Sequence, residues 1–339
     1  MIAGEGTTGV AGAAGVESGA GDAAQAAPLR IGTRGSQLAV TQTEWAARRL
    51  QEASGRGFEI VRVTTHGDVN RASLSTLGGQ GVFATELREA LREGACELVV
   101  HSLKDLPTAP APGLEIGAYP VREDARDALC SAGGAAGLTL DQLPAGAKVG
   151  TGSPRRIAQL RAVRPELDIR DIRGNVDTRL GFVESGELDA VLLACAGLER
   201  LGRTSVITER LPLDRFPTAP GQGCLALERR EGEEIPGLSE LDDRAARLAV
   251  TAERAVLAAL EAGCAAPLGA SAVLEDGRPE DVDAAGDTLT CTAAVYSLDG
   301  SRSLEATAWV ADPDETAARE LGEALAAELL ERGAGGLLR

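Results

Sequence analysis

The sequence predicts an α/β protein in which two α/β domains precede a smaller α+β domain. The chain has 339 residues, enough for two or three domains of about 100–200 residues each. Up to residue 228, short apolar runs alternate with helical patterns, as expected of a mostly parallel sheet covered by helices. After residue 240 the order changes to a long helix, several strands and a final helix, which is typical of an α+β unit.

The first α/β pattern starts at Leu29. Helical spacing covers residues 38–50, where Ser36 is a suitable N-cap, and residues 82–94. Apolar runs alternate with these helices and predict three strands: LRIGTR (29–34), FEIVRVTT (58–65) and ELVVHS (97–102).

The second pattern follows an acidic stretch near residues 122–127, which we interpret as a loop. Pro154 stands at the first position of a predicted helix over 154–163, and Asn175 is a suitable N-cap for another helix that ends at Gly186. Strands are predicted at AKVGT (147–151), LDIRDI (167–172) and DAVLLAC (189–195). APGQGCLALE (219–228) predicts a return loop and a further strand.

The last part begins with a predicted helix over 242–263 and ends with one from about Pro313. Between them lie three predicted strands, two of which flank an Asp-Gly turn at 299–300: SAVLE (271–275), TLTCTAAVYS (288–297) and SLEATAWVA (303–311).

The composition excludes several classes of protein. Lys and Arg number 34 against 51 Asp and Glu, and the net charge of −17 argues against a general binder of nucleic acid or anionic membranes. No run reaches the roughly 18–20 apolar residues of a membrane span. The six cysteines include no CxxC pair, so we expect reduced thiols in a cytoplasm and no metal site. Residues 1–28 are rich in Gly and Ala without Lys or Arg, which predicts a disordered tail.

HSLKDLP (101–107) follows a predicted buried strand, where ligands bind in open α/β sheets. The carboxylate of Asp105 could hold an N–H-rich or cationic group there and move a proton. A surface pair of Lys104 and Asp105 before a proline is the alternative interpretation. His101 by itself is more typical of a packed, hydrogen-bonded histidine than of a catalyst.

Arginines recur at the predicted ends of strands and the starts of helices. TGSPRR (151–156) opens a helix whose free N–H groups and dipole favour an anion, and its two arginines could bind carboxylate or phosphate. Solvated surface arginines are the alternative for any one of them. In a chain of net charge −17, their recurrence predicts a pocket for a multiply anionic ligand: Arg34, Arg155, Arg156, Arg173, Arg179 and Arg200.

EAGCAAPLG (261–269) places Cys264 at the end of a predicted helix, and two interpretations remain open. A small buried cysteine is ordinary at such a position. A thiol among small residues is also open to attachment, since reactivity depends on thiolate formation and access.

Ten segments in this order and spacing resemble the porphobilinogen deaminase (hydroxymethylbilane synthase) family: RIGTRGSQLA, GGQGVFATEL, VVHSLKDLP, VREDARDA, VGTGSPRR, IRGNVDTRL, LLACAGLERLG, TAPGQGCLALE, VTAERAVL and EAGCAAPLGA. The resemblance covers about residues 29–335. It implies two α/β domains similar to periplasmic binding proteins that face each other across a cleft, and a third domain that carries the cofactor cysteine. The domains implied are a tail at 1–28, a discontinuous first domain at 29–123 and 220–240, a second at 124–219 and a third at 241–339.

The resemblance also implies an activity: a cytoplasmic, monomeric transferase that joins four porphobilinogen molecules head to tail, releases ammonia and yields hydroxymethylbilane. A dipyrromethane cofactor on Cys264 would prime the chain, with Asp105 as catalytic acid. The implied cofactor contacts are Cys264, Lys104, Ser153, Arg155, Arg156, Asn175 and Ser36. The implied substrate contacts are Arg34, Arg173, Arg179, Arg200 and Gln222.

Four positions depart from the family pattern. Thr76 and Gln80 stand where many relatives have lysines, so a charge contact of that glycine-rich loop with substrate is in doubt. Gly152 replaces a common hydroxyl residue, and Pro154 an aliphatic one.

Two other classes of protein stay open as hypotheses. A two-lobed protein that binds or senses an anionic ligand would explain the arginines, but it gives Asp105 and Cys264 no role. A transferase with Cys264 as a transient nucleophile would need a histidine base, and His66 and His101 are both distant in sequence.

Overall fold

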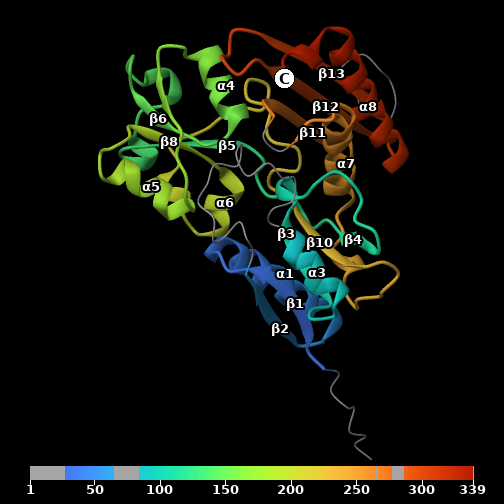
Figure 1. The fold of residues 1–339 in the computed structure, drawn as a ribbon. Helices are drawn as coiled ribbons and strands as arrows, with labels where there is room; N and C mark the ends of the chain where they lie inside the picture. Colours follow the sequence, from blue (N-terminus) through green and yellow to red (C-terminus); the bar gives the residue numbers. More distant parts are fainter. Residues whose placement is uncertain (1–26, 65–83, 264–265, 277–285, 339) are drawn as a thin grey trace, which may run out of the picture.

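The computed structural model describes residues 27–64, 84–263, 266–276 and 286–338, which form two mixed α/β units and a third unit with an antiparallel sheet (Figure 1). The predicted tail lies almost wholly outside the described residues. Each sheet takes its strands from one of the domain ranges expected from sequence, and this supports those ranges as a proposal.

The first sheet has five strands in the order β2-β1-β3-β10-β4. Only β10 runs against its neighbours, so the sheet is mostly parallel, as predicted. Its strands are β1 (Leu29–Arg34), β2 (Phe58–Val63), β3 (Leu98–Ser102), β4 (Leu114–Ala118) and β10 (Leu225–Arg230). The helices of this unit are α1 (Gln37–Ser54) and α3 (Thr85–Arg92).

The second sheet repeats this plan in the order β7-β6-β8-β5-β9, with β5 as the one antiparallel strand. Its strands are β5 (Asp127–Ser131), β6 (Lys148–Gly150), β7 (Asp168–Arg170), β8 (Ala190–Ala194) and β9 (Glu209–Arg210). Its helices are α4 (Pro154–Val163), α5 (Val176–Glu184) and α6 (Cys195–Arg200). The antiparallel strand of each sheet is therefore the one that the chain enters when it crosses between the two units.

The third unit is a three-stranded antiparallel sheet packed against two helices. Its elements are α7 (Arg244–Ala259), β11 (Leu268–Asp276), β12 (Asp287–Tyr296), β13 (Ser303–Ala311) and α8 (Glu315–Glu331). Apolar side chains of α7, α8 and one face of the sheet form a core of their own, separate from the cores of the other units. The described residues also form six short 3-10 turns: η1 (Leu103–Asp105), η2 (Gly134–Ala136), η3 (Leu140–Gln142), η4 (Thr204–Val206), η5 (Ser239–Leu241) and η6 (Ala334–Gly336).

Local sequence signals explain where several helices begin. Ser36, Ser153 and Asn175 are N-caps whose side chains accept the N–H of the residue three positions on, which confirms the predicted caps at Ser36 and Asn175. Pro154 occupies the first turn of α4, where its missing N–H costs nothing. These caps place the first turns of α1, α4 and α5 directly after strands β1, β6 and β7.

The interpretation of residues 122–127 as a loop is right up to Asp127, where β5 begins. β4 and β5 were not predicted, and residues 195–200 form α6 where the sequence suggested only the end of a strand. These elements are short, so periodicity carries little information about them.

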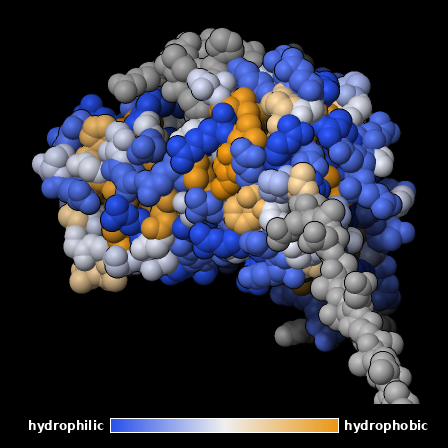
Figure 2. All heavy atoms as spheres, turned by 90° about the horizontal axis from the view of Figure 1, so that it is seen from below, coloured by the Kyte–Doolittle hydropathy of each residue, from blue (hydrophilic) through white to orange (hydrophobic). Residues whose placement is uncertain are grey.

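The surface is mostly hydrophilic on the face that Figure 2 draws. Figure 2 shows one face on which hydrophilic residues predominate and hydrophobic ones gather in a band near the middle. In the described parts of the chain, no helix is both long and apolar enough to cross a membrane.

Candidate active site

Asp105 lies at the end of β3, in the turn η1. The turn is held from both sides, because the Leu103 N–H donates to the carbonyl of Cys224 over 3.0 Å and the Leu106 N–H donates back to Leu103 over 3.0 Å. Leu103 is fully buried. Gly221 lies against it, since a Cβ at that glycine would be 2.8 Å from Leu103 Cγ. The buried strand and the packed leucine therefore set the position of the Asp105 carboxylate.

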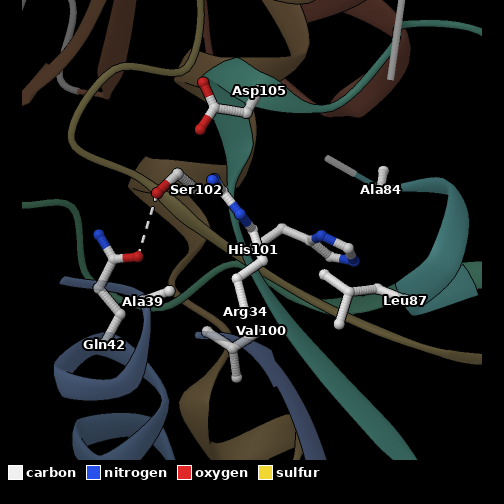
Figure 3. Close-up of a pocket in the computed structure, with 9 residues that line it drawn as sticks. All are labelled: Arg34, Ala39, Gln42, Ala84, Leu87, Val100, His101, Ser102 and Asp105. Carbon is white, nitrogen blue, oxygen red and sulfur yellow. Dashed lines mark hydrogen bonds between the residues drawn. The ribbon is translucent and has the colours of Figure 1, made fainter. Parts of the chain in front are cut away.

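A pocket opens beside Asp105 (Figure 3). The Ser102 hydroxyl donates to Gln42 Oε1 over 3.0 Å, and Figure 3 shows the Arg34 side chain running toward Ser102 and Asp105. The pocket is lined by Arg34, Ala39, Gln42, Ala84, Leu87, Val100, His101, Ser102 and Asp105. It combines a carboxylate, a guanidinium and an apolar floor, which suits an N–H-bearing ring with an acidic substituent.

His101 is a buried, hydrogen-bonded residue, which agrees with its interpretation from sequence. Its Nε2 lies 3.0 Å from Glu228 Oε2, and Arg88 Nη2 lies 2.8 Å from the other oxygen of the same carboxylate. Glu228 is only 1% exposed, so this group is part of the core behind the pocket.

A second cluster lies where α4 meets the crossing segments between the two α/β units. Asp127, fully buried on β5, accepts from Arg155 Nη1 over 2.8 Å, from Arg156 Nη2 over 2.6 Å and from Gln222 Nε2 over 2.8 Å. The two guanidiniums hold the pKa of the Asp127 carboxyl well below its usual range, against the effect of burial. Asp127 was not predicted as a site residue, because the sequence distinguishes it only by its place in the segment VREDARDA.

Gln222 connects the two α/β units at this point. Its Oε1 is 3.4 Å from Lys104 Nζ of the first unit and 3.4 Å from Arg156 Nη2 of the second, while its Nε2 donates to Ala125 O over 2.7 Å. Burial, together with the nearby Arg156 charge, lowers the pKa of the Lys104 ammonium to about 8. Gln222 is only 1% exposed and therefore lies inside the site, whereas the Lys104 side chain is partly exposed to solvent.

Further arginines add positive charge on the second unit. Burial and the charges of Arg156 and Arg173 lower the pKa of the Arg179 guanidinium to about 10. Arg179 Nε donates to the Gly174 carbonyl over 2.8 Å, and Arg173 Nη2 lies 3.4 Å from Asp171 Oδ1. Arg200 donates to the Gly223 carbonyl over 2.7 Å, and burial lowers its pKa. Like charges so close together are costly, and a bound polyanion would relieve that cost.

The sequence predicted these residues as one site, and the structure brings six of the thirteen together in two adjoining parts. Arg34 and Asp105 line the pocket, whereas Arg155, Arg156 and Gln222 form the buried cluster, and Lys104 links the two. Arg155 Nε is buried with no hydrogen-bond partner among the described residues. The arrangement fits a group that carries several carboxylates, such as the dipyrromethane implied by the resemblance.

The three polar contacts expected from Ser36, Ser153 and Asn175 also serve the fold, because all three are helix N-caps. The serine oxygens accept backbone N–H groups, so their own O–H groups remain able to donate to a carboxylate. Gly152 has a steric reason for departing from the family pattern. A Cβ there would lie 2.6 Å from the Ile172 carbonyl oxygen and 3.2 Å from Arg173 Cζ.

Cys264, Thr76, Gln80 and His66 lie outside the described residues. The five described cysteines are buried, and burial raises the pKa of each thiol: Cys96, Cys130, Cys195, Cys224 and Cys291. Such thiols are poor nucleophiles, so none of the five is a good candidate for a covalent attachment. Among the described residues, no group of three His, Cys, Asp or Glu side chains is placed to hold a metal ion.

Comparison with known proteins covers nearly the whole chain. A family model described as "Porphobilinogen deaminase, dipyromethane cofactor binding domain" matches residues 29–235, and one described as "Porphobilinogen deaminase, C-terminal domain" matches residues 247–331. A porphobilinogen deaminase of Leifsonia xyli is 56% identical over 91% of this chain and 94% of its own length. One of Nocardia farcinica is 53% identical over 94% and 90%.

Solved structures similar to this chain include the methionine-binding protein MetQ, with a TM-score of 0.40 and 11% identity over 63% of this chain and 89% of that one. Another is the periplasmic VFT2 domain of Bordetella pertussis BvgS, with a TM-score of 0.37 and 17% identity over 63% and 86%.

Proposed function

The chain belongs to the porphobilinogen deaminase family, and from this premise we propose that it joins four porphobilinogen molecules head to tail, releasing ammonia, to give hydroxymethylbilane. The observation that carries the proposal is the excess of half-buried arginine charge beside the Asp105 pocket, in a chain whose net charge is −17. A growing chain of pyrroles with acidic side chains is a ligand that such a site would bind.

Asp105 is the proposed catalytic residue. Its carboxylate faces a pocket with apolar walls, where charge interactions are stronger than in water. It can accept the N–H of a substrate pyrrole, stabilise the cation that forms when the amine leaves, and hold the proton that goes to that amine. Arg34 lines the same pocket and would bind a carboxylate of the same substrate unit.

The arginines of the second unit are the proposed binding residues for the acidic side chains. Arg173, Arg179 and Arg200 would bind substrate. A carboxylate bound at Arg179 would relieve the repulsion from Arg156 and Arg173 that the free protein bears, and one bound at Arg200 would pair a guanidinium whose pKa burial lowers. Gln222 would fix Lys104 against Arg156, so that cations from both α/β units keep one arrangement.

A dipyrromethane, when bound, would supply the pyrrole carbon to which the first substrate unit is joined. The residues proposed to hold it are Cys264, Lys104, Ser153, Arg155, Arg156, Asn175 and Ser36. The raised thiol pKa of the five described cysteines supports Cys264 as the site of attachment. We also infer a cytoplasmic monomer without a nucleic-acid partner, in keeping with the acidic composition.

Two variants test the proposal. The intact mass of the purified protein should exceed the chain mass by one dipyrromethane, and Cys264→Ser should lose that excess. Asp105→Asn should keep the wild-type melting temperature and the attached group but lose nearly all turnover of porphobilinogen. An unmodified wild-type chain that consumes no porphobilinogen would contradict the proposed function and would favour a two-lobed binding protein. Normal turnover by Asp105→Asn would remove Asp105 from the mechanism.

A further inference from the structure

The helix α7 contacts two chain segments that adjoin the Asp105 turn, through two adjacent residues. Glu253 is fully buried and accepts the Gly221 N–H over 2.7 Å, and Gly221 packs on Leu103 of the Asp105 turn. Its neighbour Arg254 donates from Nη1 to the carbonyl of Leu106 over 3.1 Å and from Nη2 to that of Pro107 over 2.6 Å. The segment VTAERAVL thus contacts the Asp105 turn where the chain leaves it, at Leu106 and Pro107.

These contacts join two different units of the protein. Leu106 and Pro107 directly follow Asp105 in the first unit, whereas Arg254 belongs to the third. α7 ends at Ala259, shortly before Cys264. The Arg254 side chain therefore joins two parts of the protein. One is the backbone next to the catalytic carboxylate, and the other is the helix that leads to the cofactor cysteine.

We propose that Arg254 is a positioning residue for catalysis, which fixes the Asp105 turn relative to the helix that leads to Cys264. This inference rests on the proposed function, because it gives Arg254 its role through Asp105. A guanidinium suits the task, since its planar, fixed pair of Nη donors matches two successive carbonyls. A displacement of about 1 Å at a reacting group can cost on the order of 100-fold in rate, so even a small movement of the turn would be measurable.

α7 offers a matched control in Arg247. This arginine also contacts the first unit, because it lies 4.9 Å from the Tyr119 ring. It donates to Asp242 over 2.7 and 2.8 Å, and Asp242 accepts the Tyr119 N–H over 2.8 Å. Its contacts are at the other end of the helix, away from the Asp105 turn. Replacing either arginine removes a similar tie between the units, but only Arg254 touches the segment after Asp105.

The experiment compares Arg254→Met, Arg254→Lys, Arg247→Met and Asp105→Asn as holoenzymes, each checked for the attached cofactor by intact mass. Arg254→Met should lower kcat at least tenfold while KM for porphobilinogen changes less than threefold. Arg254→Lys should recover part of kcat, because an ammonium can still donate to one carbonyl. Arg247→Met should keep the wild-type kcat, with a loss of melting temperature similar to that of Arg254→Met.

A wild-type kcat in Arg254→Met, or an equal loss of kcat in Arg247→Met, would overturn the inference. If Arg254→Met does not fold, Arg254→Lys decides, since the inference requires its kcat to fall below that of Arg247→Met. Failure of the proposed function is recognised separately, because the wild-type chain would then carry no dipyrromethane and consume no porphobilinogen. Normal turnover by Asp105→Asn would remove Asp105 from the mechanism and would overturn the inference with it. An inactive Asp105→Asn beside a fully active Arg254→Met would leave the function intact and refute only the positioning role.

Discussion

The substitution Asp127→Asn tests the buried cluster between the two α/β units. It removes one negative charge and keeps the shape of the side chain. Arg155 and Arg156 would then remain at 3% and 6% exposure without the carboxylate that neutralises them. Asparagine also brings an NH₂ group to a place where the described side-chain partners all donate, namely Arg155 Nη1, Arg156 Nε and Nη2, and Gln222 Nε2.

The expected loss is large. Removing one partner of a buried ion pair costs about 3–5 kcal/mol, because the other charge stays buried and uncompensated. Some compensation remains, since Arg155 also donates to Pro217 O over 3.0 Å and Arg156 to Leu192 O over 3.1 Å. We therefore expect the free energy of unfolding to fall by about 3–5 kcal/mol, and not by the sum of all the broken hydrogen bonds.

Urea unfolding followed by circular dichroism measures this difference, with Asp141→Asn as control. Asp141 pairs with Arg215 over 3.1 Å, but its side chain is 64% exposed, and such pairs contribute less than about 1 kcal/mol. The folded-state pKa of Asp127 lies below the unfolded value of about 3.9, so its stabilising charge is fully present above that pH and is lost as the pH falls through the folded pKa. The difference between wild type and variant should thus be the same at pH 5.5 and pH 6.5, below the pKa of about 8 of the Lys104 ammonium. A loss as small as that of the control would refute the reasoning.

Three further variants probe the site. Arg179→Met should raise KM for porphobilinogen about tenfold or more and leave the melting temperature of the free protein unchanged or higher. The reason is that the substitution removes a guanidinium whose pKa is already lowered to about 10 by burial and like charges. An unchanged KM would exclude Arg179 from substrate binding. The rate should fall as the pH rises through about 8, where the Lys104 ammonium loses its proton, and Lys104→Met should lack this descent; a descent that persists in the variant belongs to another group. Gly221→Ala should lower kcat, because the new Cβ would lie 2.8 Å from Leu103 Cγ in the Asp105 turn. Gly232→Ala is the control and should keep kcat, because Gly232 has a similar φ of 73° and its new Cβ would have no atom within 4 Å. Equal kcat in both variants would count against the packing argument.

The parts of the fold that depend on local signals could be predicted from the sequence. Ser36 and Asn175 cap helices as expected, since capping needs only a side-chain oxygen and the next few residues. β5 was missed because it begins at Asp127, whose charge is typical of a loop until its buried arginine partners are known. Those partners lie 28 and 29 residues away, beyond the reach of any periodicity.

The same limit applies to the candidate site. The arginines were predictable as a group, because so many cations at strand ends of an acidic chain need a ligand. The different surroundings of the individual arginines were not predictable. Arg155 and Arg156 pair with the Asp127 carboxylate, whereas Arg179 lies near the like charges of Arg156 and Arg173. Gln222 was predicted as a polar contact for substrate, which stays a prediction. Its contacts to groups 66 and 118 residues away in the chain could not be predicted from sequence.

The position of β10 has a consequence for how the protein is made. This strand lies between β3 and β4 in the first sheet, yet it follows the entire second α/β unit in sequence. On the ribosome, the first sheet therefore remains divided until residue 225 and those after it have left the exit tunnel, while the second unit already has all its strands. Because domains generally fold as units during synthesis, we expect the second unit to close before the first sheet is complete, so that the order of folding reverses the order in sequence.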